Sequence, residues 1–112
     1  MKAGDAIAEI LKREGIEIVI GYPVNHILEY AASAGIRPII VRQERTGPHM
    51  ADAISRLSSG RTVGVFAMQH GPGAENAFGG VARLIASRSL CSSCPADIHG
   101  VFRTWRRTSI RY

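Results

Sequence analysis

The chain has 112 residues, of which 46% are hydrophobic and 21% are charged. This length accommodates one domain, and the composition excludes collagen-like, low-complexity and wholly disordered chains. No apolar stretch approaches the roughly 18 residues of a membrane helix, and no secretory signal pattern is present. The sequence therefore predicts a cytoplasmic protein that does not enter a membrane.

The net charge of +5 is concentrated at the C-terminal end of the chain. Residues 1–82 contain eight basic and eight acidic residues and are neutral, whereas residues 83–112 contain six arginines and one acid, Asp97. Both cysteines and the single tryptophan also lie in residues 83–112. The composition therefore predicts one domain over residues 1–82, followed by a basic tail over residues 83–112.

The first half of the domain has helix, strand and helix patterns in turn. Residues 5–14 have apolar side chains at helical spacing and Gly15 as a C-cap, which predicts a helix. Residues 16–21 predict a short apolar strand. Residues 25–34 return to helical spacing, and Gly35 closes that second helix.

The second half of the domain repeats the alternation. Residues 38–41 predict a buried strand, and residues 44–59 predict a third helix with Gly60 after it. Residues 62–68 predict a third strand. A fourth helix is expected from about residue 74 into the low 80s.

This order of elements predicts an α/β fold built on a partial doubly wound parallel sheet. Alternating strands and helices at this spacing favour parallel strands joined by right-handed crossovers. Because only three strands are predicted, we expect an open sheet edge where a fourth strand would pair with the third.

Ligands in such sheets bind outside the carboxyl ends of the strands, which here are residues 22–26, 42–47 and 69–76. Glu44 is the acid in these segments that begins a predicted helix. It is either a helix N-terminal acid stabilised by the dipole or a carboxylate aimed into the ligand crevice. Its placement alone leaves both interpretations open.

Gly71-Pro72-Gly73 is a second feature of these segments. Its glycines either let the backbone approach a ligand or simply form a turn, and Asn25 is explained as a helix cap. The turn is not a phosphate loop, because no lysine follows it in the required pattern. The four histidines are far apart and no Gly-x-Ser-x-Gly occurs, so neither a metal site nor a hydrolase triad is predicted.

Several motifs together resemble the amino-terminal pyrimidine-binding domain of thiamine diphosphate enzymes, in particular the acetolactate synthase-like members. The resemblance covers residues 4 to about 82. The motif regions that carry it, in chain order, are Gly21-Tyr22-Pro23, then Arg42-Gln43-Glu44-Arg45 together with His49-Met50-Ala51-Asp52, and then Gly71-Pro72-Gly73-Ala74-Glu75-Asn76. Three motif regions in the right order and spacing are far more specific than any one of them.

The resemblance implies thiamine diphosphate as cofactor and a reaction that makes or breaks a carbon–carbon bond of a 2-keto acid. In the family, the glutamate after the second strand hydrogen-bonds N1′ of the aminopyrimidine and favours the imino tautomer that removes the thiazolium C2 proton. This role would fall on Glu44, as a carboxyl group that shares a proton with the ring. Pro23, Gly71, Gly73 and Asn76 are the implied wall residues of the cofactor site.

The chain departs from the family pattern at three positions. Gln69-His70 stands where acetolactate synthases usually carry Thr-Ser, and Gln43 stands where they usually carry His. These departures concern the substrate more than the cofactor.

A further family feature is absent from this sequence. The family holds the diphosphate through Mg²⁺ in a separate carboxy-terminal domain marked by Gly-Asp-Gly, usually on another subunit, and that motif does not occur here. We therefore expect no metal site in this chain and no activity from it alone. It would need a diphosphate-binding domain or a second subunit, and a full-length relative would form a homo-oligomer.

The tail departs from the family pattern within one helix turn of Ala82. A shift of reading frame after about residue 82 would restore a family-like strand, so we hypothesise that residues 83–112 are out of frame or disordered. Reading a GC-rich gene out of frame also accumulates arginine and cysteine. Two functional alternatives stay open: a zinc site from Cys91, Cys94 and His99, and nucleic-acid binding by the arginines with Trp105.

Two competing hypotheses stay open for the whole chain. The first is a stand-alone pyrimidine-domain subunit of a split decarboxylase, which needs a partner chain carrying Gly-Asp-Gly. The second is a non-enzymatic protein, either a degraded remnant or a small basic binding protein. Because residues 1–82 are neutral, nucleic-acid binding by that domain is disfavoured.

Overall fold

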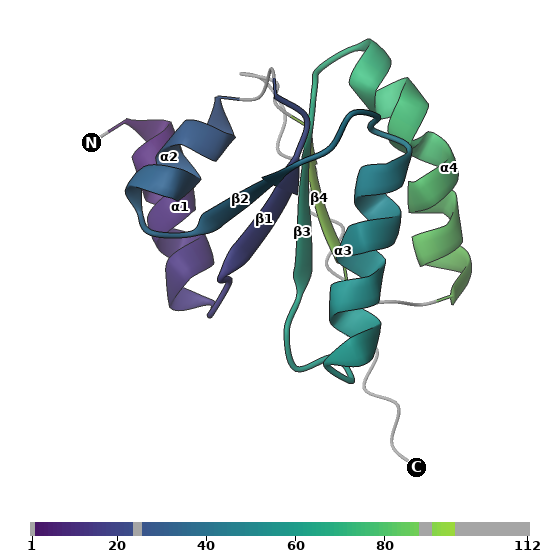
Figure 1. Cartoon of the computed structure of the whole chain (residues 1–112), viewed down its shortest axis with the longest axis horizontal. Helices are drawn as coiled ribbons and strands as arrows, with labels where there is room; N and C mark the ends of the chain where they lie inside the picture. Colours follow the sequence, from purple (N-terminus) through teal and green to yellow (C-terminus); the bar gives the residue numbers. More distant parts are fainter. Residues whose placement is uncertain (1, 24–25, 88–90, 96–112) are drawn as a thin grey trace.

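The fold is an α/β sandwich around one parallel sheet (Figure 1). A computed structural model of the chain describes residues 2–23, 26–87 and 91–95. The helices are α1 (Ala3–Arg13), α2 (Ile27–Ser33), α3 (Thr46–Leu57) and α4 (Pro72–Ser87). The strands are β1 (Ile18–Gly21), β2 (Arg37–Ile40), β3 (Gly64–Met68) and β4 (Cys91–Pro95). The predicted α/β class and partial doubly wound sheet are confirmed.

The four strands run parallel in the order β2-β1-β3-β4. Helices α1 and α2 lie on one face of this sheet, and α3 and α4 lie on the other (Figure 1). Right-handed crossovers explain this arrangement. Because β2 pairs with one side of β1 and β3 pairs with the other, the helices that connect these strands lie on opposite faces.

Alternate side chains of the central strands fill two separate cores. Side chains on one face pack against α1 and α2, and those on the other face pack against α3 and α4. The first core contains Val19, Val65 and Ala67, and the second contains Ile20, Phe66 and Met68. Strand β3 is buried along its whole length, as expected of a strand covered on both faces.

Glycines at the helix ends explain where the strands begin. Gly15 has a φ of 77° and Gly35 a φ of 84°, a conformation that favours glycine, and both were predicted as C-caps. After Gly15, the amide of Ile16 donates to the carbonyl of Leu11 (3.0 Å) and closes the helix. Since this amide is used by the helix end, β1 begins two residues later than predicted, at Ile18.

The prediction of a three-stranded sheet is wrong. The backbone of β4 pairs in parallel with β3 over five residues, so β3 has a neighbour on both sides and the expected open edge beside it is absent. The prediction rested on side-chain pattern, whereas a parallel ladder is made by backbone groups that every residue except proline supplies in full.

The described helices include none with the length and apolar character to cross a membrane.

Candidate functional site

The sheet has a topological switch point between β1 and β3. β2 lies on one side of β1 and β3 on the other, so the loops after these strands diverge to opposite faces. Backbone hydrogen bonds keep the strand ends together here. The amide of Tyr22 donates to the carbonyl of Ala67 (3.1 Å), and the amide of Val41 donates to the carbonyl of Gly21 (2.9 Å).

Glu44 lies in the turn between β2 and α3, at this edge of the sheet. The amide of Thr46 donates to the carbonyl of Gln43 (3.1 Å) across the turn, so α3 begins at Thr46 and not at Glu44 as predicted. Glu44 is only 6% exposed, whereas its neighbours Arg42 and Arg45 are exposed. No residue in the described ranges forms an ion pair with the Glu44 carboxylate. Burying a carboxylate without a cation costs free energy, so its place here favours a functional role over a structural one.

Gly73 makes room for the Glu44 carboxylate. A Cβ atom at Gly73 would lie 3.1 Å from Oε1 of Glu44 and 2.9 Å from Cβ of Gln69. The first turn of α4 therefore approaches both side chains closely, and only glycine permits this without a shift. The structure thus brings together Glu44 and Gly73, two residues that the sequence analysis singled out from segments about 30 positions apart in the sequence.

The other predicted wall residues, Gly71, Asn76 and Pro23, are all exposed. Gly71 is in the turn before α4 with a φ of 64°, and Asn76 is exposed in the first turns of α4. Pro23 is exposed after β1 and lines a different pocket, described below. The predicted cap residue Asn25 lies outside the described residues.

Close packing holds α3 and α4 in place beside Glu44. Gly64 lies against the backbone of Ala51, and its amide donates to Oγ of Ser55 (2.8 Å). Further along α4, a Cβ at Gly80 would lie 2.7 Å from Cβ of Pro48. These glycine contacts let α3 pack directly on β3 and α4 directly on α3, so the helix that follows the Glu44 turn is held between them.

Asp52, in the second of the three motif regions, has a structural role. It is buried on α3, and its Oδ2 accepts a hydrogen bond from Nε of Arg56 one turn later (2.8 Å). His49 of the same motif is exposed. Asp52 is therefore paired within α3, whereas Glu44 forms no ion pair among the described residues.

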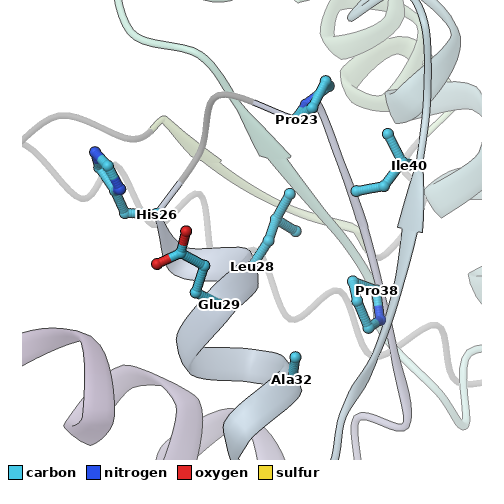
Figure 2. A pocket seen from close by; sticks show the side chains of 7 residues that line it. All are labelled: Pro23, His26, Leu28, Glu29, Ala32, Pro38 and Ile40. Carbon is cyan, nitrogen blue, oxygen red and sulfur yellow. The ribbon is translucent and has the colours of Figure 1, made fainter.

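A pocket of about 390 Å³ lies elsewhere, between α2 and β2 (Figure 2). Its walls are mainly apolar, and His26 and Glu29 supply its polar side chains. It is lined by Pro23, His26, Leu28, Glu29, Ala32, Pro38 and Ile40. This pocket could not be predicted from the sequence. The apolar pattern of a helix and an edge strand is the same when the two pack tightly as when they leave a space between them. Neither Glu44 nor Gly73 lines it.

Within the described part of the chain, no three histidine, cysteine, aspartate or glutamate side chains gather in a way that could hold a metal ion. The zinc site considered for the tail depends on side chains outside that description.

Comparison with known proteins decides the family. The model for the thiamine pyrophosphate enzyme N-terminal TPP binding domain matches residues 1–90. The chain belongs to the thiamine pyrophosphate enzyme family. The recognition made from the sequence is confirmed, and the match extends beyond the expected end of the resemblance at about residue 82.

Relatives in the thiamine pyrophosphate enzyme family include acetolactate synthase large subunits. That of Haemophilus influenzae is 39% identical over 85 residues, which are 72% of this chain and 14% of the relative. The probable acetolactate synthase large subunit of Methanocaldococcus jannaschii is 34% identical over 92 residues, 80% of this chain and 15% of the relative. The 2-hydroxyacyl-CoA lyase 2 of Danio rerio is 40% identical over 76 residues, 65% of this chain and 12% of the relative. The chain thus spans a small part of the length of the relatives it matches.

Proposed function

We propose that this chain binds the aminopyrimidine half of thiamine diphosphate through Glu44, as part of an enzyme similar to acetolactate synthase. The observation that carries the proposal is the buried Glu44 carboxylate, which has no cationic partner in the described ranges and faces a glycine that leaves room beside it. The donor chemistry fits the cofactor, because a buried carboxyl group is suited to share a proton with a basic ring nitrogen.

Glu44 is proposed to hold that proton at one of its carboxyl oxygens and to orient the ring against the end of the sheet. When bound, thiamine diphosphate would supply a thiazolium carbon that can lose its proton to a base and then attack a carbonyl group. Gly73 lets the first turn of α4 approach, while Gly71, Asn76 and Pro23 are proposed to form the wall of the site. Because Glu44 is buried, little water reaches its carboxyl group. The proton is then shared with the ring and does not exchange with solvent.

The rest of the catalytic centre is proposed to come from outside this chain. The matched relatives are named for an acetolactate synthase and for a 2-hydroxyacyl-CoA lyase, and the chain spans 12–15% of their lengths. We propose that a diphosphate-binding domain or second subunit holds the diphosphate with Mg²⁺, and that the chain is inactive without it. The proposed reaction makes or breaks a carbon–carbon bond of a 2-keto acid in the cytoplasm, as a transferase or lyase.

Calorimetric titration with thiamine diphosphate tests the role of Glu44. We expect the wild-type chain to bind and Glu44→Gln to bind at least about tenfold more weakly, because a hydrogen bond to a charged group contributes about 1.5–3 kcal/mol. Glu29→Gln is the matched control, since Glu29 is an exposed acid on α2 and lies at the other pocket. Equal affinities of the wild type and Glu44→Gln would reject the proposed role.

The origin of residues 83–112 is a separate proposal. We propose that these residues are read out of frame, from a mutation or a sequencing error near codons 82–84. Sequencing the gene from codon 75 to several hundred bases beyond the stop tests this. A correction of one or two bases that restores a family-like strand and a later Gly-Asp-Gly supports the proposal. A confirmed frame with no such motif downstream contradicts it.

A further inference from the structure

Gln69 is the polar residue that shares the space around Gly73 with Glu44. It directly follows β3, whose five residues are all buried, and it is itself only partly buried. Its Cβ and the Oε1 of Glu44 both approach the position that a Cβ of Gly73 would occupy, at 2.9 and 3.1 Å. The base of the Gln69 side chain and the carboxyl end of the Glu44 side chain therefore both lie next to Gly73.

The chemistry of Gln69 complements that of Glu44. An ionised carboxylate only accepts hydrogen bonds, whereas a carboxamide both donates and accepts them. When a planar ligand forms hydrogen bonds to Glu44 along one edge, we expect its adjacent edge to lie beside the side chains around Gly73. Gln69 is the one of these whose carboxamide can pair with either a ring nitrogen or an exocyclic amine.

We infer that Gln69 is a second ligand-contacting side chain of the Glu44 site and that it selects heteroaromatic ligands with hydrogen-bonding groups on two adjacent edges. This inference rests on the proposed function, because it concerns the ligand that Glu44 binds. The neighbouring His70 is exposed and has no such position relative to Gly73 in the described contacts. The chain therefore offers a matched pair of adjacent residues for a test.

The affinity of the full chain for thiamine diphosphate is the first test. Gln69→Leu keeps the approximate shape and removes the hydrogen-bonding groups, and we expect it to weaken binding by about three- to tenfold. His70→Ala should bind as the wild type does. If Glu44→Gln weakens binding and Gln69→Leu does not, the inference about Gln69 is wrong and the proposed function stands. If the wild type does not bind, or Glu44→Gln binds equally well, both fail.

A second measurement needs no ligand and excludes misfolding as the cause. In ¹H–¹⁵N spectra of the ligand-free chain, Glu44→Gln should move the side-chain amide signals of Gln69. Glu75→Gln should leave them in place, because Glu75 is an exposed acid about half a helical turn away from Gly73. Unmoved Gln69 signals in Glu44→Gln, or equal movement in Glu75→Gln, would overturn the inference.

Discussion

Both helical layers of this molecule use glycines for close packing, since a Cβ at Gly21 would collide with Leu28 of α2, and the layers differ at the edge strand β2. On the α3–α4 side, glycines let backbone and side chains meet closely, as at Gly64 on Ala51 and Gly80 on Pro48. On the α2 side, the contact with the edge strand β2 leaves a pocket, and Ile40 is 53% exposed at its rim. Glu44 does not line this pocket and lies in the turn before α3. The comparison teaches that the pocket and the contact between Glu44 and Gly73 lie in different places, although Pro23, one of the proposed wall residues, lines the pocket.

Breaking the closest contact of the α3 layer should have the largest effect. In Gly64→Ala the added Cβ meets the backbone carbonyl of Ala51, so we expect a loss of about 3 kcal/mol or more in the free energy of unfolding. Gly79→Ala is the control, because a Cβ there has open space and helix propensity favours alanine by about 1 kcal/mol. Urea unfolding monitored by circular dichroism measures both. Equal stability of the two variants would contradict the packing described here.

Gly73→Ala tests the Glu44 site separately from the packing of the helices. The added Cβ would press on Oε1 of Glu44 and on Cβ of Gln69, so thiamine diphosphate binding should fall by about tenfold, equivalent to about 1.4 kcal/mol. Gly80→Ala creates a similar crowding against Pro48, further along the same helix. It should destabilise the chain by about 1–3 kcal/mol and leave binding unchanged under conditions where the chain is folded. Calorimetry that finds the opposite ranking of affinities would contradict the site.

Gly71→Ala tests the turn before α4 through backbone strain alone. Gly71 has a φ of 64° and nothing near its Cβ position, so the expected cost is about 1 kcal/mol from the left-handed conformation. The midpoint of urea unfolding measures it. A stabilised variant would show that the turn does not have this conformation in solution.

The smallest effect is expected at the α2–β2 pocket. Ile40→Thr places a β-branched residue at a half-exposed edge position, so the free energy of unfolding should change by no more than about 0.5 kcal/mol. Binding of thiamine diphosphate should be unaltered. Loss of binding in this variant would place the ligand in the pocket and reverse the comparison between the two layers.

The sequence predicted the α/β class, the helices and three strands, and the helix ends at Gly15 and Gly35, because glycine and apolar spacing act locally. It also named Glu44 and Gly73. Their contact could not be predicted from either segment, because it depends on how closely α4 approaches the end of β2. Strand β4 was missed because its pairing uses backbone groups. The sequence marked Gln69 as a departure from the family pattern, but its place beside Gly73 depends on the approach of α4 and could not be predicted.

Mapping the binding of thiamine diphosphate by ¹H–¹⁵N spectroscopy of the full chain tests the central claim most directly. The account predicts that the signals of Glu44, Gly73 and their neighbours at the carboxyl ends of β2 and β3 move together as the cofactor is added. The signals of Leu28, Ala32 and Ile40 should stay in place. Movement confined to the α2–β2 pocket, with the signals around Glu44 unchanged, would contradict the account.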